Sequence, residues 1–289
     1  MDHVYFRGTS GHARAERSRL EMRGISPQLD PDHPCDAFFF ELFRLTGLDG
    51  RAYRDHSLQR RVPACLRFLK AEDLDAAREK LVAAPHLASA LLNVVLLGVT
   101  EFYRDKPVFD QLRERVLPVL RARNRRLRIW SAACSDGQEL VSVATLLADV
   151  GLLDRCEFLG SDCREDAIRR AQAGIYPQQA AVGFAASSSS YFVSNILKVQ
   201  LAAPLMKVLR WTVSDLLQGP EPGPWDLILW RNMAIYLRPA VAANVWNSLI
   251  RELQPGGFLV CGKADHLPNH PDLVKISPSI HQKRLESKE

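Results

Sequence analysis

The sequence has no hydrophobic run long enough to cross a membrane, because its longest apolar stretch, residues 91–99, is short and is interrupted by Asn93. Residues 1–24 contain basic side chains but no apolar core, so they do not resemble a secretory signal. The six cysteines are scattered, form no Cys-x-x-Cys pair and have no histidine at zinc-ligand spacing. These absences predict a cytoplasmic protein with reduced thiols, no membrane insertion and no metal site.

A large excess of charge of one sign is also absent. The net charge of +5, from 38 Lys and Arg against 33 Asp and Glu, permits an acidic partner but is too small to indicate nucleic-acid binding. The densest basic run, residues 121–128, joins a helical segment to an apolar strand and is interpreted as a solvated connection. Hydrophobic residues make up 47% of the chain, which is enough for a folded core.

The chain divides into segments of different composition. Residues 1–34 are polar and end in a proline-rich stretch, which predicts a mobile arm and linker. Residues 35–95 predict a helical N-terminal domain, and residues 96–270 predict a larger α/β domain with an insertion at about 177–212. Residues 271–289 are interpreted as a C-terminal tail.

The N-terminal domain reads as three or four helices without strands, which predicts a small bundle. Apolar residues at helical spacing follow Asp36, a candidate N-cap. A second candidate helix is basic and carries Arg60 and Arg61. Pro63 lies within this pattern and is expected to kink or split the helix.

From about Arg128 onward, short apolar runs alternate with helical stretches, which predicts an α/β fold with a parallel sheet and crossover helices. The run at residues 227–230 consists of four apolar residues, as expected for a strand buried on both faces. In such sheets the ligand binds beyond the carboxyl ends of the strands, near the point where the strand order reverses. The site is therefore expected in the turns that follow the strands.

Three such turns carry candidate binding residues. Residues 134–140 form a small-residue turn that opens a helix, but they lack the GxGxxG spacing of a pyrophosphate site. Asp162 ends the second predicted strand, where an acid accepts hydrogen bonds from both ribose hydroxyls; a helix N-cap is the alternative. Arg231 and Asn232 follow another buried strand. This combination favours a nucleoside ligand without a pyrophosphate, and S-adenosylmethionine fits that description.

Six segments in order also resemble the chemotaxis receptor methyltransferases of the CheR type. They are VTEFYRD (Val99–Asp105), IWSAACSDGQEL (Ile129–Leu140), LGSDCREDAIRRAQAGIY (Leu159–Tyr176), SDLL (Ser214–Leu217), WDLILWRNMAIYL (Trp225–Leu237) and LQPGGFLVCGKAD (Leu253–Asp265). The resemblance implies a small all-α domain followed by a Rossmann-like methyltransferase sheet domain with a small β subdomain. It also implies methyl transfer from S-adenosylmethionine to glutamate side chains on the cytoplasmic helical domain of a chemoreceptor-like protein. A monomer is expected.

The resemblance further implies roles for individual residues. Arg104 and Tyr236 are the implied catalytic residues, with Tyr236 close to the transferred methyl group. The implied cofactor-binding residues are Thr100, Arg104, Glu139, Asp162, Asp215, Leu216, Asn232 and Met233. Arg60 and Arg61 would face the acidic methylation helix of the receptor, where charge complementarity serves orientation and encounter.

The chemistry of the implied reaction is consistent with these residue types. A glutamate carboxylate is already ionised near pH 7, since its ordinary pKa is about 4.3, so no strong general base is required. Positioning of the two reactants and exclusion of water are the main needs. Arg104 can hold a carboxylate in a bidentate fork, either that of the cofactor or that of the substrate. No metal is required for this transfer.

Several positions depart from the pattern of the family. Gly98 stands in place of an asparagine, Asp136 and Gln138 change the turn after the first strand, and Lys263 replaces a histidine. These departures leave open a catalytically weakened or inactive relative that acts as a receptor- or cofactor-binding signalling module. A small-molecule or nucleic-acid methyltransferase on the same fold is the other alternative, supported only by the basic run at residues 121–128.

Overall fold

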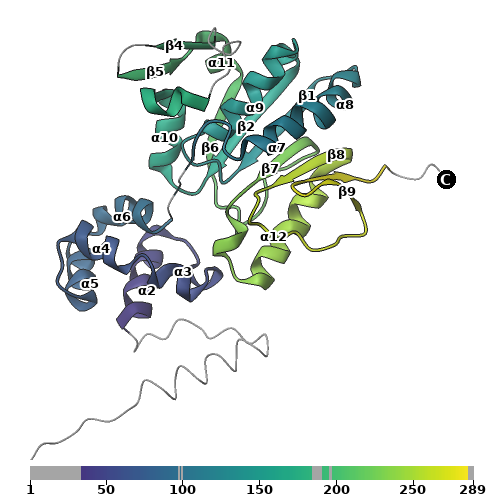
Figure 1. Ribbon diagram of the computed structural model, residues 1–289. Coiled ribbons are helices and arrows are strands. Elements are labelled where there is room, and N and C mark those ends of the chain that lie inside the picture. The colour runs from purple at the N-terminus through teal and green to yellow at the C-terminus, as the bar shows by residue number, and fades with distance from the viewer. Residues whose placement is uncertain (1–33, 97, 99, 184–190, 195–196, 286–289) are drawn as a thin grey trace, which may run out of the picture.

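The computed structural model describes residues 34–96, 98, 100–183, 191–194 and 197–285. A group of helices from the N-terminal part lies beside a large sheet that carries helices on both faces (Figure 1). The predicted arm, apart from Pro34, lies outside the described residues. None of the helices in the described ranges combines the length and the apolar character needed to cross a bilayer.

The described α-helices are α2 (Pro34–Thr46), α3 (Asp55–Gln59), α4 (Val62–Leu69), α5 (Leu74–Ala83), α6 (Ala88–Val95), α7 (Lys106–Gln111), α8 (Leu117–Ala122), α9 (Gln138–Asp149), α10 (Glu165–Ala173), α11 (Ala203–Val208) and α12 (Pro239–Arg251). The shorter or wider helical turns are η1 (Gly50–Ala52), η2 (Pro85–Leu87), η3 (Leu112–Val116), η4 (Leu153–Arg155), η5 (Gln178–Gly183) and η7 (Ala234–Tyr236). The strands are β1 (Leu127–Ala132), β2 (Cys156–Asp162), β3 (Ile175–Pro177), β4 (Phe192–Ser194), β5 (Lys198–Leu201), β6 (Leu209–Val213), β7 (Trp225–Trp230), β8 (Leu253–Cys261), β9 (Leu273–Ser277) and β10 (Ile280–Lys283).

The helical N-terminal domain has the organisation that the sequence predicts. The basic segment is split into α3 and α4 at Arg60 and Arg61, and Pro63 lies in the first turn of α4, where its missing N–H costs little. Asp73 caps α5 by accepting a hydrogen bond from the N–H of Ala76 at 2.8 Å. Asp36 lies in the first turn of α2 instead of at the predicted N-cap, because the helix already begins at Pro34.

The large sheet has seven strands in the order β6-β2-β1-β7-β8-β10-β9. The first five run parallel, and β10 pairs antiparallel with both β8 and β9. The strand order reverses at β1, whose neighbours β2 and β7 are reached in opposite directions along the sheet. The predicted α/β fold is confirmed, and the carboxyl ends of β1, β2 and β7 meet at the edge where a ligand is expected.

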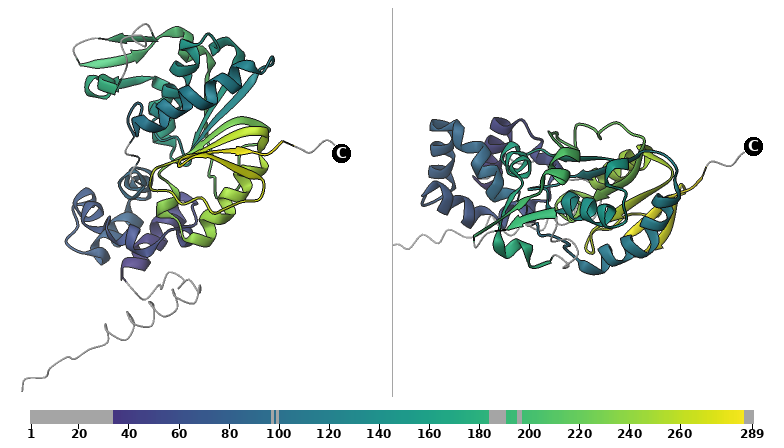
Figure 2. Two further views of the ribbon diagram at one scale, coloured as in Figure 1. Left: turned by 45° about the vertical axis from the view of Figure 1, so that its right-hand side comes forward. Right: turned by 90° about the horizontal axis from the view of Figure 1, so that it is seen from above.

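The two faces of the sheet bury separate apolar cores. Leu127 and Ile129 of β1 pack with α7, α8 and α9, whereas Trp130 of β1 and Trp230 of β7 pack on the other face with α12. The core of the helical N-terminal domain is continuous with this second face. Figure 2 shows the N-terminal helices next to the α12 side of the sheet. Burial of a shared core therefore holds the helical domain against the sheet domain.

Polar contacts fix the position of the helical domain more closely. The N–H of Arg54 donates to the carbonyl of Tyr236 at 2.9 Å, and the N–H of Arg238 donates to the carbonyl of Ala52 at 2.9 Å. The guanidinium of Arg238 also pairs with Asp55 at 2.7 Å. These bonds join the segment before α3 to the segment that carries Tyr236, so the two domains meet at a predicted catalytic residue.

Two predicted boundaries were wrong. Residues 273–283 are not a tail, because β9 and β10 extend the main sheet beyond β8; these strands are short, and a strand of this length gains its stability from pairing. The insertion at 177–212 begins earlier, with β3 at Ile175, and ends before β6, which pairs with β2 in the main sheet. β3, β4 and β5 form the small antiparallel sheet at the top of Figure 1.

Candidate functional site

A cavity lies at the carboxyl edge of the sheet, between the sheet domain and the helical domain. Its wall is formed by Gly98, Thr100, Glu101 and Arg104, by the turn after β1, by the ends of β2 and β7, and by Tyr53 and Ser57 of the helical domain. The predicted residues that line it are Thr100, Arg104, Glu139, Asp162, Asn232, Met233 and Tyr236. A smaller adjoining cavity is lined by Asp215, Leu216 and Met233. Arg60 and Arg61 line neither cavity; they lie between α3 and α4, one turn beyond Ser57.

The turn after β1 is held in an unusual backbone conformation. Ala133, Ser135 and Gly137 have φ values of 55°, 53° and 89°, in the left-handed region that non-glycine residues seldom adopt. Gly137 is the N-cap of α9, and a Cβ there would lie 2.4 Å from the ring of Trp211. The N–H of Ser135 donates to Asp162 at 2.9 Å, which ties the turn to the end of β2. Such clustered strain is typical of binding sites.

Arg231 connects three parts of the cavity wall, although its sequence position after a buried strand only weakly indicates its importance. Its side chain is 1% exposed and its guanidinium donates to Glu139 at 3.0 Å, to Asp105 at 2.9 Å and to the carbonyl of Arg104 at 2.7 Å. Glu139 also accepts a hydrogen bond from Ser131 Oγ at 2.7 Å. Arg231 therefore positions both the Glu139 carboxylate at the start of α9 and the segment that carries Arg104.

Asn232 is positioned by Asp265, the last residue of the six segments that resemble the family. Asn232 has φ 59°, and its N–H donates to Asp265 Oδ2 at 2.5 Å. The N–H of Gly262 donates to the same oxygen at 2.8 Å, and a Cβ on Gly262 would lie 2.7 Å from Asn232. Burial raises the pKa of Asp265 above its usual range, against the effect of these N–H donors.

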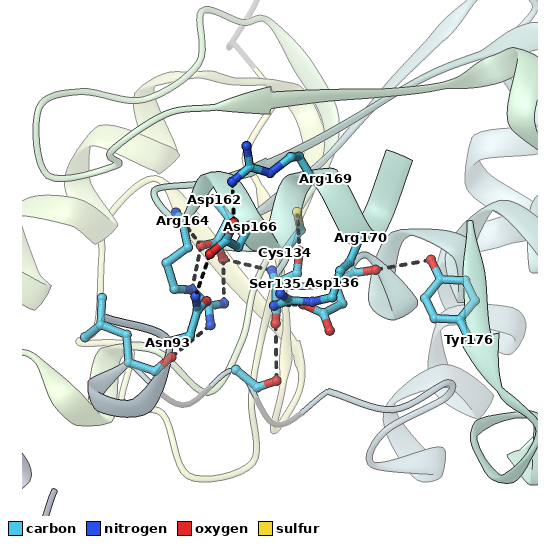
Figure 3. Close-up of polar contacts among 12 residues, drawn as sticks. Asn93, Cys134, Ser135, Asp136, Asp162, Arg164, Asp166, Arg169, Arg170 and Tyr176 are labelled. Carbon is cyan, nitrogen blue, oxygen red and sulfur yellow. Dashed lines mark hydrogen bonds and ion pairs between the residues drawn. The ribbon is translucent and has the colours of Figure 1, made fainter. Parts of the chain in front are cut away.

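Asp162 ends β2 and is 4% exposed. Besides Ser135, its partners are the N–H and the guanidinium of Arg164, which follows it two residues later (Figure 3). The sequence therefore placed the acid correctly at the strand end, but it gave no sign that an arginine would cover it. Arg164 itself is buried and precedes α10 as its N-cap residue.

The smaller cavity combines apolar walls with one acceptor that lacks a partner. Asp215 Oδ1 accepts the N–H of Leu217 at 3.0 Å, whereas Oδ2 is buried without a hydrogen-bond partner. Leu216, Leu217 and Met233 contribute the apolar surface. A flat apolar ring that carries an amino group would satisfy this oxygen, since an unpaired buried acceptor is costly. Adenine has that form.

Cys163, the residue after Asp162, lines both cavities. Burial raises the pKa of its thiol to about 12, so the thiol is neutral at physiological pH. Tyr53, Ala133 and Met233 are also shared by both cavities. The two spaces therefore adjoin each other as one elongated site.

Three of the departures noted in the sequence, Asp136, Gln138 and Lys263, do not line the large cavity. Asp136 pairs with Arg170 of α10 at 2.9 Å, so its added charge has a partner of its own. Lys263 is exposed on the segment after β8. Among the described residues no group of three or more His, Cys, Asp or Glu side chains could hold a metal ion. The absence of a metal requirement stays a prediction.

Residues 98–282 match the family described as CheR methyltransferase, SAM binding domain. The chain is 27% identical over 206 residues to chemotaxis protein methyltransferase 1 of Vibrio cholerae, covering 67% of this chain and 75% of that protein. It is 30% identical over 204 residues to a protein of Rhizobium etli described as a probable chemotaxis protein methyltransferase, covering 65% of this chain and 76% of that protein. It is 26% identical over 246 residues to a chemotaxis protein methyltransferase of Listeria monocytogenes, covering 84% of this chain and 94% of that protein.

The family match includes the large sheet, apart from the last residue of β10, and every predicted residue that lines the two cavities. The resemblance drawn from the six sequence segments and the prediction of S-adenosylmethionine as cofactor are thereby confirmed. The roles of the individual residues stay predictions. The chain belongs to the CheR methyltransferase family, and residues 98–282 are its S-adenosylmethionine-binding domain.

Proposed function

We propose that the protein transfers a methyl group from S-adenosylmethionine to glutamate side chains on the cytoplasmic helical domain of a chemoreceptor-like protein. The observation that carries this proposal is the elongated site, in which a cavity with an amino-group acceptor adjoins a cavity with carboxylates and an arginine. The names of the relatives, which are chemotaxis protein methyltransferases, support the choice of substrate.

The residues of the site match the chemical groups of S-adenosylmethionine in order. Asp215 Oδ2 accepts from the adenine amino group between Leu216 and Met233, and Asp162 accepts from the ribose hydroxyls. Glu139 attracts the ammonium of the methionine end, and Arg104 and Thr100 lie on the same wall. Asn232 lies across the cavity, where its backbone conformation is fixed by Asp265.

The side chains at the cavity mouth position the nucleophile. When bound, S-adenosylmethionine supplies a methyl group that is attached to a positively charged sulfur. Arg104 holds a carboxylate by a planar fork, and Tyr236 donates a hydrogen bond that orients the incoming glutamate. Closure by the helical domain, through Tyr53 and Ser57, excludes water from the transfer.

The helical domain provides the approach for the receptor. Ser57 and Leu58 of α3 belong to the cavity wall, and Arg60 is exposed directly after this helix, with Arg61 next to it. A receptor helix that carries acidic side chains along this basic edge would bring a glutamate to Tyr236. We infer that the enzyme acts as a cytoplasmic monomer, with residues 35–95 as the receptor-facing domain.

Calorimetric titration with S-adenosylmethionine and S-adenosylhomocysteine tests the cofactor part of this proposal. We expect saturable binding of one equivalent to the full chain. A chain that binds neither compound, but still binds a receptor cytoplasmic fragment, would support the alternative of a receptor-binding module without turnover. Transfer to a small molecule or nucleic acid, and not to the receptor fragment, would support the other alternative.

A further inference from the structure

The carboxylate of Asp162 has all of its hydrogen-bonding positions filled by the protein. Oδ1 accepts from the N–H of Arg164 at 3.0 Å and from Arg164 Nε at 2.9 Å. Oδ2 accepts from the N–H of Ser135 at 2.9 Å and from Arg164 Nη2 at 3.2 Å. A carboxylate offers about four lone-pair positions, so these four donors saturate it. No acceptor position is left for a ribose.

Two of the four donors are fixed, and two can move. The N–H groups of Ser135 and Arg164 belong to the main chain of the turns that follow β1 and β2. The other two belong to the Arg164 guanidinium, which lies against both carboxylate oxygens in Figure 3. A ribose presents two hydroxyl donors and therefore competes for the two positions that the guanidinium holds.

The surrounding residues favour this position of the guanidinium. The Arg164 side chain is 7% exposed, and its Nη1 donates to the carbonyl of Leu96 at 2.9 Å. A Cβ on residue 98 would lie 2.6 and 2.7 Å from the two terminal nitrogens of this guanidinium, closer than any side-chain carbon tolerates. Gly98 therefore leaves the space that the guanidinium occupies.

We propose that Arg164 is a latch on the ribose subsite: its guanidinium pairs with Asp162 in the free protein and must turn away before S-adenosylmethionine binds. This proposal rests on the assignment of Asp162 to the ribose. The latch lowers the affinity for the cofactor, because the ion pair has to be broken first. The demethylated product carries the same ribose, so its affinity is lowered too.

The test is calorimetric titration of S-adenosylhomocysteine into the full chain and its variants. Arg164→Met removes the competing donors and keeps a long side chain, so we expect binding to tighten about tenfold or more. Arg164→Gln keeps a single amide group as a competing donor, so its affinity for S-adenosylhomocysteine should lie between those of the wild type and Arg164→Met. Arg169→Gln is the matched control, since Arg169 lies on α10, the helix that Arg164 caps, but pairs with the exposed Glu165 and with Asp166; this variant should bind like the wild type.

A double variant, Asp162→Asn with Arg164→Met, tests the assignment of Asp162 to the ribose separately from the proposal that Arg164 is a latch. If Asp162 binds the ribose, the double variant should bind at least tenfold more weakly than Arg164→Met. Equal affinity of these two variants would overturn the assignment of Asp162 and the latch with it. A double variant that binds more weakly, together with an Arg164→Met variant no tighter than the wild type, would overturn the latch alone. If Arg164→Met does not fold, Arg164→Gln decides: wild-type or weaker affinity would overturn the latch.

Discussion

Replacement of Arg231 by methionine should disrupt the protein at two levels, its stability and its cofactor site. The substitution keeps a long unbranched side chain but removes three hydrogen bonds to Glu139, Asp105 and the carbonyl of Arg104. Loss of one partner from a buried ion pair costs about 3–5 kcal/mol. Glu139 is 14% exposed and keeps Ser131 as a partner, and Asp105 is 29% exposed and open to water, so we expect the lower end, about 3 kcal/mol.

Thermal unfolding and calorimetric titration measure the two effects. At about 3 kcal/mol, the melting temperature should fall by roughly 6–12 °C. Binding of S-adenosylhomocysteine should weaken at least tenfold, because Glu139 and the segment that carries Arg104 lose their common anchor. Arg113→Met is the control, since Arg113 is 52% exposed and its ion pair with Asp149 is 3.8 Å long, and it should change stability by less than about 1 kcal/mol. An Arg231→Met variant with wild-type stability or wild-type affinity would refute this reasoning.

Four further predictions follow from the site. If Asp215 Oδ2 accepts from adenine, the inosine analogue of S-adenosylhomocysteine should bind about tenfold or more weakly, and equal affinities would remove Asp215 from the adenine site. Arg104→Lys keeps the positive charge but loses the planar guanidinium fork, so the rate of methyl transfer should fall at least tenfold. A lysine variant with wild-type cofactor binding and wild-type turnover would remove Arg104 from the site. Because burial raises the folded-state pKa of Asp265 above the unfolded value of about 3.9, its contribution to stability is lost as the pH rises through the folded pKa. Urea unfolding of Asp265→Asn should therefore show stability that rises, relative to the wild type, as the pH increases above about 4, and parallel pH profiles would contradict this. Cys163, with a thiol pKa of about 12, should react slowly with iodoacetamide near pH 7 and more slowly still with S-adenosylhomocysteine bound; no protection would place the ligand elsewhere.

Features that depend on local sequence were predictable. Alternating apolar and helical segments predicted the parallel sheet, and strand ends placed Asp162 and Asn232 at one edge, because carboxyl ends of parallel strands share an edge. Pro63 predicted the break between α3 and α4, since proline is tolerated only in the first turn of a helix.

Features that depend on pairing between distant segments were not predictable. The strands β9 and β10 are short, and they become strands because β10 pairs with the edge of β8 and β9 pairs with β10. Tyr53 and Ser57 enter the site because a shared apolar core brings the helical domain against the sheet, which no local pattern encodes. Arg164 stands at a helix start, where its sequence position gives no hint that its side chain folds back onto Asp162.

The most direct test of the central claim is transfer of labelled methyl groups from S-adenosylmethionine to a receptor cytoplasmic fragment. The proposed function predicts incorporation as glutamate methyl esters, which release labelled methanol in mild base, and loss of incorporation when the modified glutamates are replaced by alanine. Binding of both the cofactor and the receptor fragment without incorporation would contradict the claim. Incorporation that mild base does not release would contradict it as well.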